Sequence, residues 1–200
     1  MSTLSRTESV TSDRAISTRL PGVDGVWVAI GADSVIFAIL FASFMQARLH
    51  NPAVFEASRH TLNINLGGID TLILLTSSWS VALGIQALKR DLVDRAPRYL
   101  LGGVLTGLMF VVSKSTEYFQ KFAHGLTPGT NPFYMWYFTL TGIHLFHVLA
   151  GNIVLIVLWF MARSGSFDPE RPVVLECGAI YWHMVDLLWI ILFPLLYLMR

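Results

Sequence analysis

The sequence has little of what a soluble enzyme or a disulfide-bonded protein needs. Only 14% of its 200 residues are charged, and its one cysteine, Cys177, excludes an internal disulfide and a metal site built from several cysteines. It contains no phosphate-binding loop, dinucleotide-binding glycine pattern or hydrolase nucleophile turn. Its basic residues are dispersed over several segments, so nucleic acid is not indicated as a partner.

Apolar residues predominate in the composition. They make up 54% of the chain, and the mean hydropathy is +0.58. Five long apolar runs reach the roughly 20 residues that a helix needs to cross a bilayer. The sequence therefore predicts an all-α integral membrane protein, a bundle of five transmembrane helices at about 25–47, 67–88, 99–119, 133–161 and 175–199.

The sequence predicts one membrane domain preceded by a short tail. Residues 1–21 are rich in Ser and Thr and lack an apolar core, which predicts a disordered cytoplasmic tail. Residues 22–200 form the five-helix domain, because the connections between the runs are too short for a soluble domain. Nine of the 14 basic residues lie in the tail and in the second and fourth connections. This asymmetry predicts a cytoplasmic N-terminus and an external C-terminus in the bacterial cytoplasmic membrane.

Five polar side chains lie deep within the predicted spans, and each would be costly facing lipid. They are Asp33, His144, His147, His183 and Asp186. One interpretation is hydrogen bonding between helices. A second is a metal or haem site, since His144 and His147 share a helix face at i, i+3. A third is a contact with a lipid headgroup or a role in proton transfer within a larger complex.

Three further patterns bear on packing. Glu117 with Lys114 and Lys121 predicts a local ion-pair network with snorkelling lysines near the outer end of the third span, with docking as the alternative. The Gly103 and Gly107 pair allows close helix approach. The run "FYMWYF" at 133–138 is typical of an interfacial aromatic belt.

Several longer segments resemble consecutive blocks of subunit III of the haem-copper oxidases. They cover nearly everything after Pro21, and the most specific are the E-Y of the third span, the T-G-x-H-x-x-H-V-x-x-G of the fourth and the Y-W-H-x-V-D-x-x-W of the fifth. The resemblance also shows departures. Asp33 stands where the family has a buried glutamate, and Asp70 where it has an asparagine. The chain resembles a five-span form, similar to the subgroup associated with nitric oxide reductase.

The resemblance implies a non-catalytic subunit that stabilises the catalytic subunit, holds lipid and supports proton uptake in aerobic electron transport. It implies catalytic subunit I and subunit II as partners, together with membrane lipids. No cofactor is expected in this chain other than bound phospholipid, since the family carries haem and copper, or iron, in the partner. Asp33 matches a carboxyl linked to proton uptake, although a protonated, purely structural carboxyl is equally open. His144, His147, His183, Asp186 and Glu117 are expected at lipid or subunit contacts.

Two alternatives remain open. The chain could be an accessory protein of a nitric oxide reductase. From a different class, it could be a self-sufficient membrane metalloenzyme that uses the His/Asp cluster.

Overall fold

The computed structural model describes residues 24–90, 92–165 and 173–199, and all of its regular elements are helical. The predicted disordered tail at 1–21 lies outside these residues. The elements are α1 (Asp24–His50), α2 (Pro52–Arg59), α3 (Ile64–Lys89), α4 (Ala96–Ala123), α5 (Pro132–Arg163), α6 (Val173–Phe193) and the π-helical turn η1 (Pro194–Leu198). The five long helices are long and apolar enough to cross a membrane, which confirms the predicted fold class.

The transmembrane helices are longer than the apolar runs that predicted them. α4, for example, begins at Ala96 and ends at Ala123, whereas its predicted span is 99–119. Hydropathy marks only the part of a helix that lies in hydrocarbon, and the backbone hydrogen-bond pattern continues into the interface beyond it. Pro97 lies in the first turn of α4, where its missing N–H costs no helical hydrogen bond.

The short helix α2 within the first connection was not predicted. Proline at its start fits the first helical turn, and Phe55 packs its ring between those of Phe44 and Phe133 at centroid distances of 5.5 and 5.6 Å. This contact fastens the connection to α1 and α5. An amphipathic helix of eight residues is too short to appear in a search for membrane spans.

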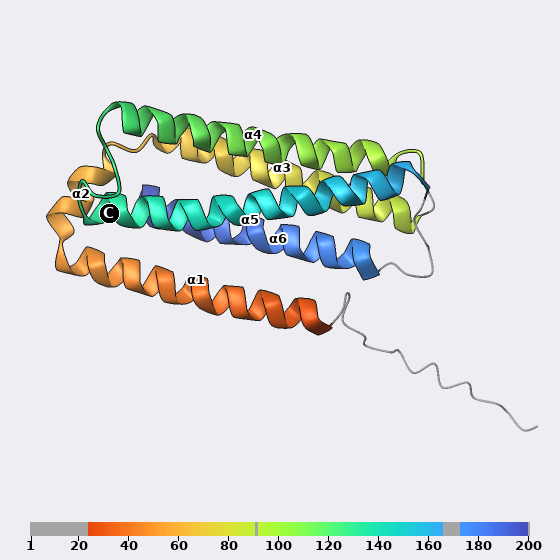
Figure 1. Cartoon of the computed structure of the whole chain (residues 1–200), viewed down its shortest axis with the longest axis horizontal. Helices are drawn as coiled ribbons and strands as arrows, with labels where there is room; N and C mark the ends of the chain where they lie inside the picture. The colour runs from red at the N-terminus through yellow and green to blue at the C-terminus, as the bar shows by residue number, and fades with distance from the viewer. Residues whose placement is uncertain (1–23, 91, 166–172, 200) are drawn as a thin grey trace, which may run out of the picture.

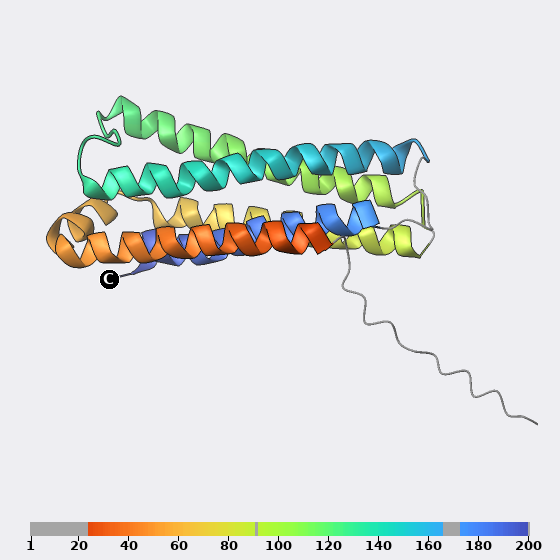
Figure 2. The same cartoon turned by 60° about the horizontal axis from the view of Figure 1, so that its bottom comes forward.

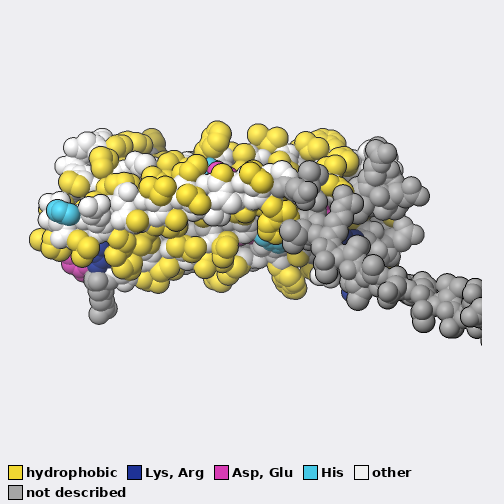
Figure 3. Space-filling model, turned by 90° about the horizontal axis from the view of Figure 1, so that it is seen from below, with side chains coloured by type: hydrophobic (Ala, Val, Ile, Leu, Met, Phe, Trp, Pro, Cys, Tyr) yellow, Lys and Arg dark blue, Asp and Glu magenta, His cyan; other side chains and the backbone are white. Residues whose placement is uncertain are grey.

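Four helices form a bundle, and α1 lies along one side of it. α3, α4, α5 and α6 pack as a closed set of neighbours, whereas α1 contacts α5, α6 and α2 (Figure 1; Figure 2). Only 11% of the most apolar window of α1 is buried, against 50% for the last span. Most of the α1 surface is therefore left for lipid or for another protein. The face seen in Figure 3 is correspondingly rich in hydrophobic side chains.

Small residues allow the closest helix contacts in the bundle. A Cβ built on Gly107 of α4 would lie 2.5 Å from Asn152 Nδ2 and 2.8 Å from the indole of Trp182. A Cβ on Gly151 of α5 would lie 2.7 Å from the same indole. The structure thus places α4, α5 and α6 in direct contact around Trp182, as the glycine spacing on the third span allows.

The structure does not support the interpretation of the aromatic run at 133–138 as an interfacial belt. Phe133, Tyr134 and Tyr137 are buried inside the bundle. They sit on the inner face of α5, where Tyr134 bonds the Thr61 hydroxyl at 2.7 Å. Composition alone does not distinguish an aromatic side chain that faces the headgroups from one that faces a neighbouring helix.

The described ends of the chain lie at opposite ends of the bundle, because the number of spans is odd (Figure 1). The direction relative to the membrane stays a prediction from the charge asymmetry. A phosphatase reporter fused after Arg200 should be active only if that end is external, and a cytosolic fluorescent reporter at the same position should be silent. The reverse pattern would contradict the predicted orientation.

Candidate functional site

The most heavily buried charges form one ionic group between α3, α4 and the C-terminal turn. Lys114 Nζ lies 2.9 Å from Asp70 Oδ2 and 2.7 Å from Glu117 Oε2. The Tyr197 hydroxyl accepts from Lys114 Nζ at 3.1 Å and donates to Glu117 at 3.1 Å. Ser113 donates to the other oxygen of Asp70 at 2.6 Å. We call these five residues the ionic core; they link α3, α4 and η1.

The two lysines do not snorkel, so that part of the sequence interpretation is wrong. Lys114 is 1% exposed and Lys121 is 6% exposed. Lys114 Nζ lies 4.6 Å from the centroid of the Trp189 ring, which adds a cation–π contact. With Lys121 included, two cations balance the two carboxylates, and a buried charge is tolerated only when it is compensated in this way.

Sequence reasoning noted Asp70 but did not connect it with Lys114, and it missed Ser113 and Tyr197. The signal was present, because the family pattern has an asparagine where this chain has a carboxylate. Lys114 was assigned to a local pair along one helix, yet its partner on α3 is 44 positions away in the sequence. Sequence spacing identifies pairs along a helix but does not identify the helix that faces them.

His144 and His147 do not share a site. His144 is 0% exposed and packs its ring against Phe110 and Trp189 at centroid distances of 5.7 and 5.2 Å. Neither of its ring nitrogens has a hydrogen-bond partner among the described residues. His147 instead donates from Nδ1 to the Ile143 carbonyl at 2.8 Å, and its Nε2 lies 3.6 Å from Asp33 Oδ2. The two side chains project from the same side of α5 but contact different helices, His144 contacting α4 and α6 and His147 contacting α1.

His183 and Asp186 lie within one turn of each other on α6. His183 Nδ1 bonds the Ser78 hydroxyl of α3 at 2.5 Å, whereas the buried carboxylate oxygens of Asp186 have no hydrogen-bond partner among the described residues. The predicted polar cluster is therefore divided among different neighbours rather than gathered in one site. Within the described residues, no three His, Cys, Asp or Glu side chains come together as metal ligands.

Asp33 faces a cleft between α1 and the bundle. The cleft has a volume of about 400 Å³ and is lined mainly by apolar side chains of α1, α5 and α6, among them Val26, Ile30, Val154 and Cys177. The Asp33 side chain is 32% exposed, so its pairing with His147 joins α1 to α5 at the edge of this cleft. This is the intramembrane carboxyl that the fold leaves most accessible among the predicted site residues.

At the end of the bundle that holds α2, the pair of Arg59 and Glu56 lies outside the spans. Arg59 Nη2 donates to Glu56 Oε1 at 2.6 Å, and this hydrogen bond holds the pKa of Glu56 below its usual range. Arg59 also donates to the Tyr197 carbonyl at 3.4 Å. The connection between α1 and α3 is thereby attached to the turn that carries the ionic-core hydroxyl.

Comparison with known proteins gives one consistent family. The family model for cytochrome c oxidase subunit III matches residues 22–200. The chain is 30% identical over 178 residues to a cytochrome c oxidase subunit 3 of Corynebacterium diphtheriae, covering 88% of this chain and 87% of that protein. It is 33% identical over 178 residues to the cytochrome c oxidase subunit 3 of a Synechocystis species, covering 88% and 74%.

A relative with a different electron donor in its name is also similar. The cytochrome bo(3) ubiquinol oxidase subunit 3 of Pseudomonas aeruginosa is 28% identical over 177 residues, covering 88% of this chain and 84% of that protein. The aligned part makes up most of the Corynebacterium protein as well. A chain of about this length therefore occurs among cytochrome c oxidase subunits, and length does not single out the nitric oxide reductase subgroup.

Proposed function

Because this chain belongs to the cytochrome c oxidase subunit III family, we propose that it packs beside the catalytic subunit I, and subunit II, of its oxidase and stabilises that complex. The chain is a non-catalytic subunit III of a haem-copper oxidase and a multi-pass protein of the bacterial cytoplasmic membrane. Through the complex it takes part in an oxidoreductase reaction. By holding lipid beside the catalytic subunit, it also supports proton uptake.

The redox groups are proposed to lie in the partner. Haem or copper needs accessible imidazole or sulfur ligands that converge on one point. His144 is instead enclosed by Phe110 and Trp189, while His147 and His183 bond to the Ile143 carbonyl and to Ser78. The arrangement of these side chains supports a bundle that is held together by polar contacts between helices.

The observation that carries the proposal is the loose attachment of α1. This helix leaves most of its apolar surface uncovered by the bundle, and such a surface suits a partner subunit and lipid. Its intramembrane polar attachment is the Asp33 to His147 pair. We therefore assign Asp33 the role of fixing α1 against α5, which keeps the docking surface in place.

Asp33→Asn should leave turnover per assembled complex unchanged, because the amide keeps the shape of the carboxyl and has an NH₂ group that can donate to His147 Nε2, while it can no longer ionise. Asp33→Leu should lower the amount of assembled complex, since the contact across helices is worth about 1 kcal/mol and is lost. Oxygen consumption normalised to the haem content of the purified complex measures the first effect, and complex yield measures the second.

Asp33→Glu serves as the matched control, because it restores the carboxyl that the family carries. If Asp33→Asn slows turnover at unchanged yield and Asp33→Glu does not, Asp33 acts in proton uptake and the structural assignment is wrong. Full assembly of Asp33→Leu would also contradict the proposed attachment of α1.

The relatives reported above are subunits of terminal oxidases, with either cytochrome c or ubiquinol in the name. The similarity to the subgroup associated with nitric oxide reductase stays a prediction from the five-span form. Identification of the polypeptides that copurify with this chain in mild detergent separates the two complexes.

A further inference from the structure

Asp186 is a buried carboxyl to which the proposed function gives no role. It lies about 20 Å along the last span, which begins at Val173, so it is near the middle of the membrane. The residue is 4% exposed. Trp182 and Trp189, one turn to either side on the same face of α6, are fully buried. The carboxyl is therefore enclosed by protein at the depth where water is scarcest.

The Asp186 carboxyl has no polar partner within the part of the chain that the structure describes. Neither of its oxygens makes a hydrogen bond there. His183, one turn before it on α6, uses Nδ1 to bond the Ser78 hydroxyl at 2.5 Å. No Lys, Arg or His nitrogen of the described residues lies within 4.0 Å of the Asp186 oxygens. A negative charge on this side chain would thus be uncompensated.

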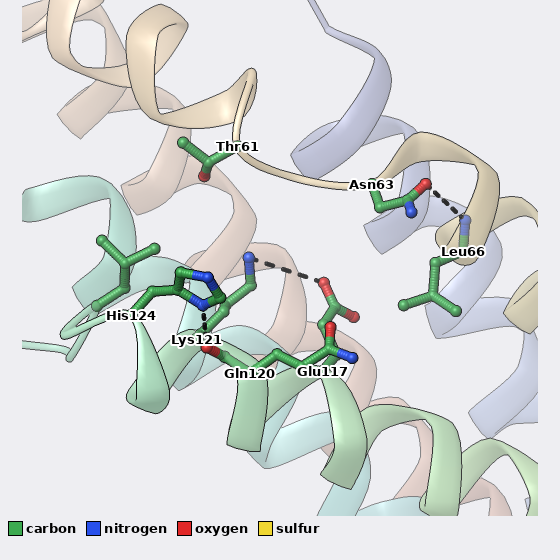
Figure 4. A pocket seen from close by; sticks show the side chains of 8 residues that line it. Thr61, Asn63, Leu66, Glu117, Gln120, Lys121 and His124 are labelled. Carbon is green, nitrogen blue, oxygen red and sulfur yellow. Dashed lines mark hydrogen bonds and ion pairs between the residues drawn. The ribbon is translucent and has the colours of Figure 1, made fainter.

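The buried cations of the spans are already matched with other carboxylates. Among the described residues, the buried lysines of the spans are Lys114 and Lys121, and no arginine of the spans is buried. Lys114 Nζ lies 2.9 Å from Asp70 and 2.7 Å from Glu117. Lys121 points toward the other oxygen of Glu117, at 3.9 Å (Figure 4). Two lysines therefore balance two carboxylates, and none is left for Asp186.

Asp70 shows what an ionised carboxyl requires in this bundle. It is 0% exposed, yet one oxygen pairs with Lys114 and the other accepts from the Ser113 hydroxyl at 2.6 Å. Such a pair of contacts is what makes a buried charge tolerable. Asp186 is almost as deeply buried and has neither contact. A carboxylate that is buried without compensation takes up a proton instead of remaining charged.

We propose that Asp186 is a proton-binding site that is occupied in the folded chain. One proton from water adds to a carboxylate oxygen and forms an O–H bond, with no change in redox state. The product is a neutral carboxyl with one hydrogen-bond donor. The proton is retained because its loss would leave an unpaired negative charge at the middle of the membrane. This assignment does not depend on the docking role of α1.

The neutral state also bears on insertion of the last span. An ionised aspartate at the centre of a transmembrane helix opposes insertion, whereas a protonated one has no full charge to bury. The described part of this span, Val173–Leu198, has one other carboxyl, Glu176 in its first turn, which pairs with Lys89 at 2.8 Å. Protonation of Asp186 thus leaves the middle of the helix uncharged.

Infrared spectroscopy of the full chain, purified in dodecyl maltoside, tests the proposal. The C=O stretching band of a protonated carboxyl is separate from the amide and carboxylate bands. Isotopic labelling of the aspartate carboxyl carbon shifts this band and distinguishes it from the esters of copurified lipid. At neutral pH the wild type should show a protonated-aspartate band, and Asp186→Asn should lose it. Asp70→Asn is the matched control and should keep it, because Asp70 is ionised in the ionic core.

Two results of this measurement would overturn the proposal. The first is a wild-type spectrum with no protonated-aspartate band, which does not depend on the folding of any variant. The second is a band that remains unchanged in Asp186→Asn, which would place the proton on a different aspartate.

Thermal unfolding distinguishes a neutral carboxyl from a charged one by a second route. Asp186→Asn exchanges one uncharged group for another of nearly the same shape, so the midpoint should change by less than about 2 °C. Asp70→Asn should lower the midpoint by about 5 °C or more, because Lys114 and Lys121 then share one buried carboxylate, Glu117. A loss in Asp186→Asn as large as in Asp70→Asn would show that Asp186 is charged and would overturn the proposal.

Discussion

Lys114→Met is expected to destabilise the folded chain by ~3–5 kcal/mol, because it leaves two buried carboxylates without their shared cation. Asp70 is 0% exposed and Glu117 is 4% exposed, so water does not replace the lost ammonium. The hydroxyls of Ser113 and Tyr197 remain as donors to these carboxylates, but a neutral hydrogen bond does not balance a full negative charge. Thermal unfolding of the purified chain in detergent, followed by circular dichroism, measures the effect.

Two controls separate burial from charge. Lys89 forms an ion pair with Glu176 at 2.8 Å, a distance similar to those of the Lys114 pairs, but its side chain is half exposed. Lys89→Met should therefore lower the free energy of unfolding by less than about 1 kcal/mol. The double variant Asp70→Asn with Lys114→Met removes both charges of one pair and restores the asparagine of the family pattern. It should recover much of the lost stability, since Lys121 remains beside Glu117. A single Lys114→Met variant as stable as the wild type would contradict the role of the ionic core.

Gly107→Leu is expected to lower the free energy of unfolding by about 3 kcal/mol, because the new side chain has no room between α4, α5 and α6. The Cβ alone would overlap Asn152 and Trp182, and Trp182 is a fully buried, rigid side chain. α4 would have to move away from α5 and α6, which would also disturb Lys114 two turns further along α4. Reduced resistance to unfolding by sodium dodecyl sulfate, with unchanged helix content before unfolding, would show the loss of packing.

Gly68→Leu is the matched control for this change. Gly68 is also helical, and nothing lies within 4 Å of a Cβ built on it. Leucine should be tolerated there or should stabilise the helix slightly. An equal loss of stability in both variants would mean that helix propensity, and not the close approach of the helices, explains the effect at Gly107.

The sequence alone was sufficient for the membrane fold class and the number of spans. Both depend on a local property, since a helix must satisfy its own backbone and remain apolar over about 20 residues to cross a bilayer. The family was also readable, because motifs such as "TGIHLFHVLAG" and "YWHMVDLLW" combine rare intramembrane polar residues at fixed spacing. The helix α2 was missed because eight residues carry no comparable signal.

The arrangement of the polar residues was decided only by the tertiary structure. Depth along the helices correctly indicated that Asp33, His144, His183 and Asp186 lie within the spans, but similar depth suggested one cluster. Packing separates them, because each helix turns its polar side chains toward a different neighbour: His147 faces α1, and His183 faces α3.

The same reason explains the ionic core and the buried aromatic run. Asp70 and Lys114 meet because α3 and α4 are paired along their length, and Tyr137 is buried because α5 presents that face to the bundle. Hydropathy and spacing describe one helix at a time. The rotation of each helix about its axis, and the choice of neighbour, follow from the close packing of all the helices together.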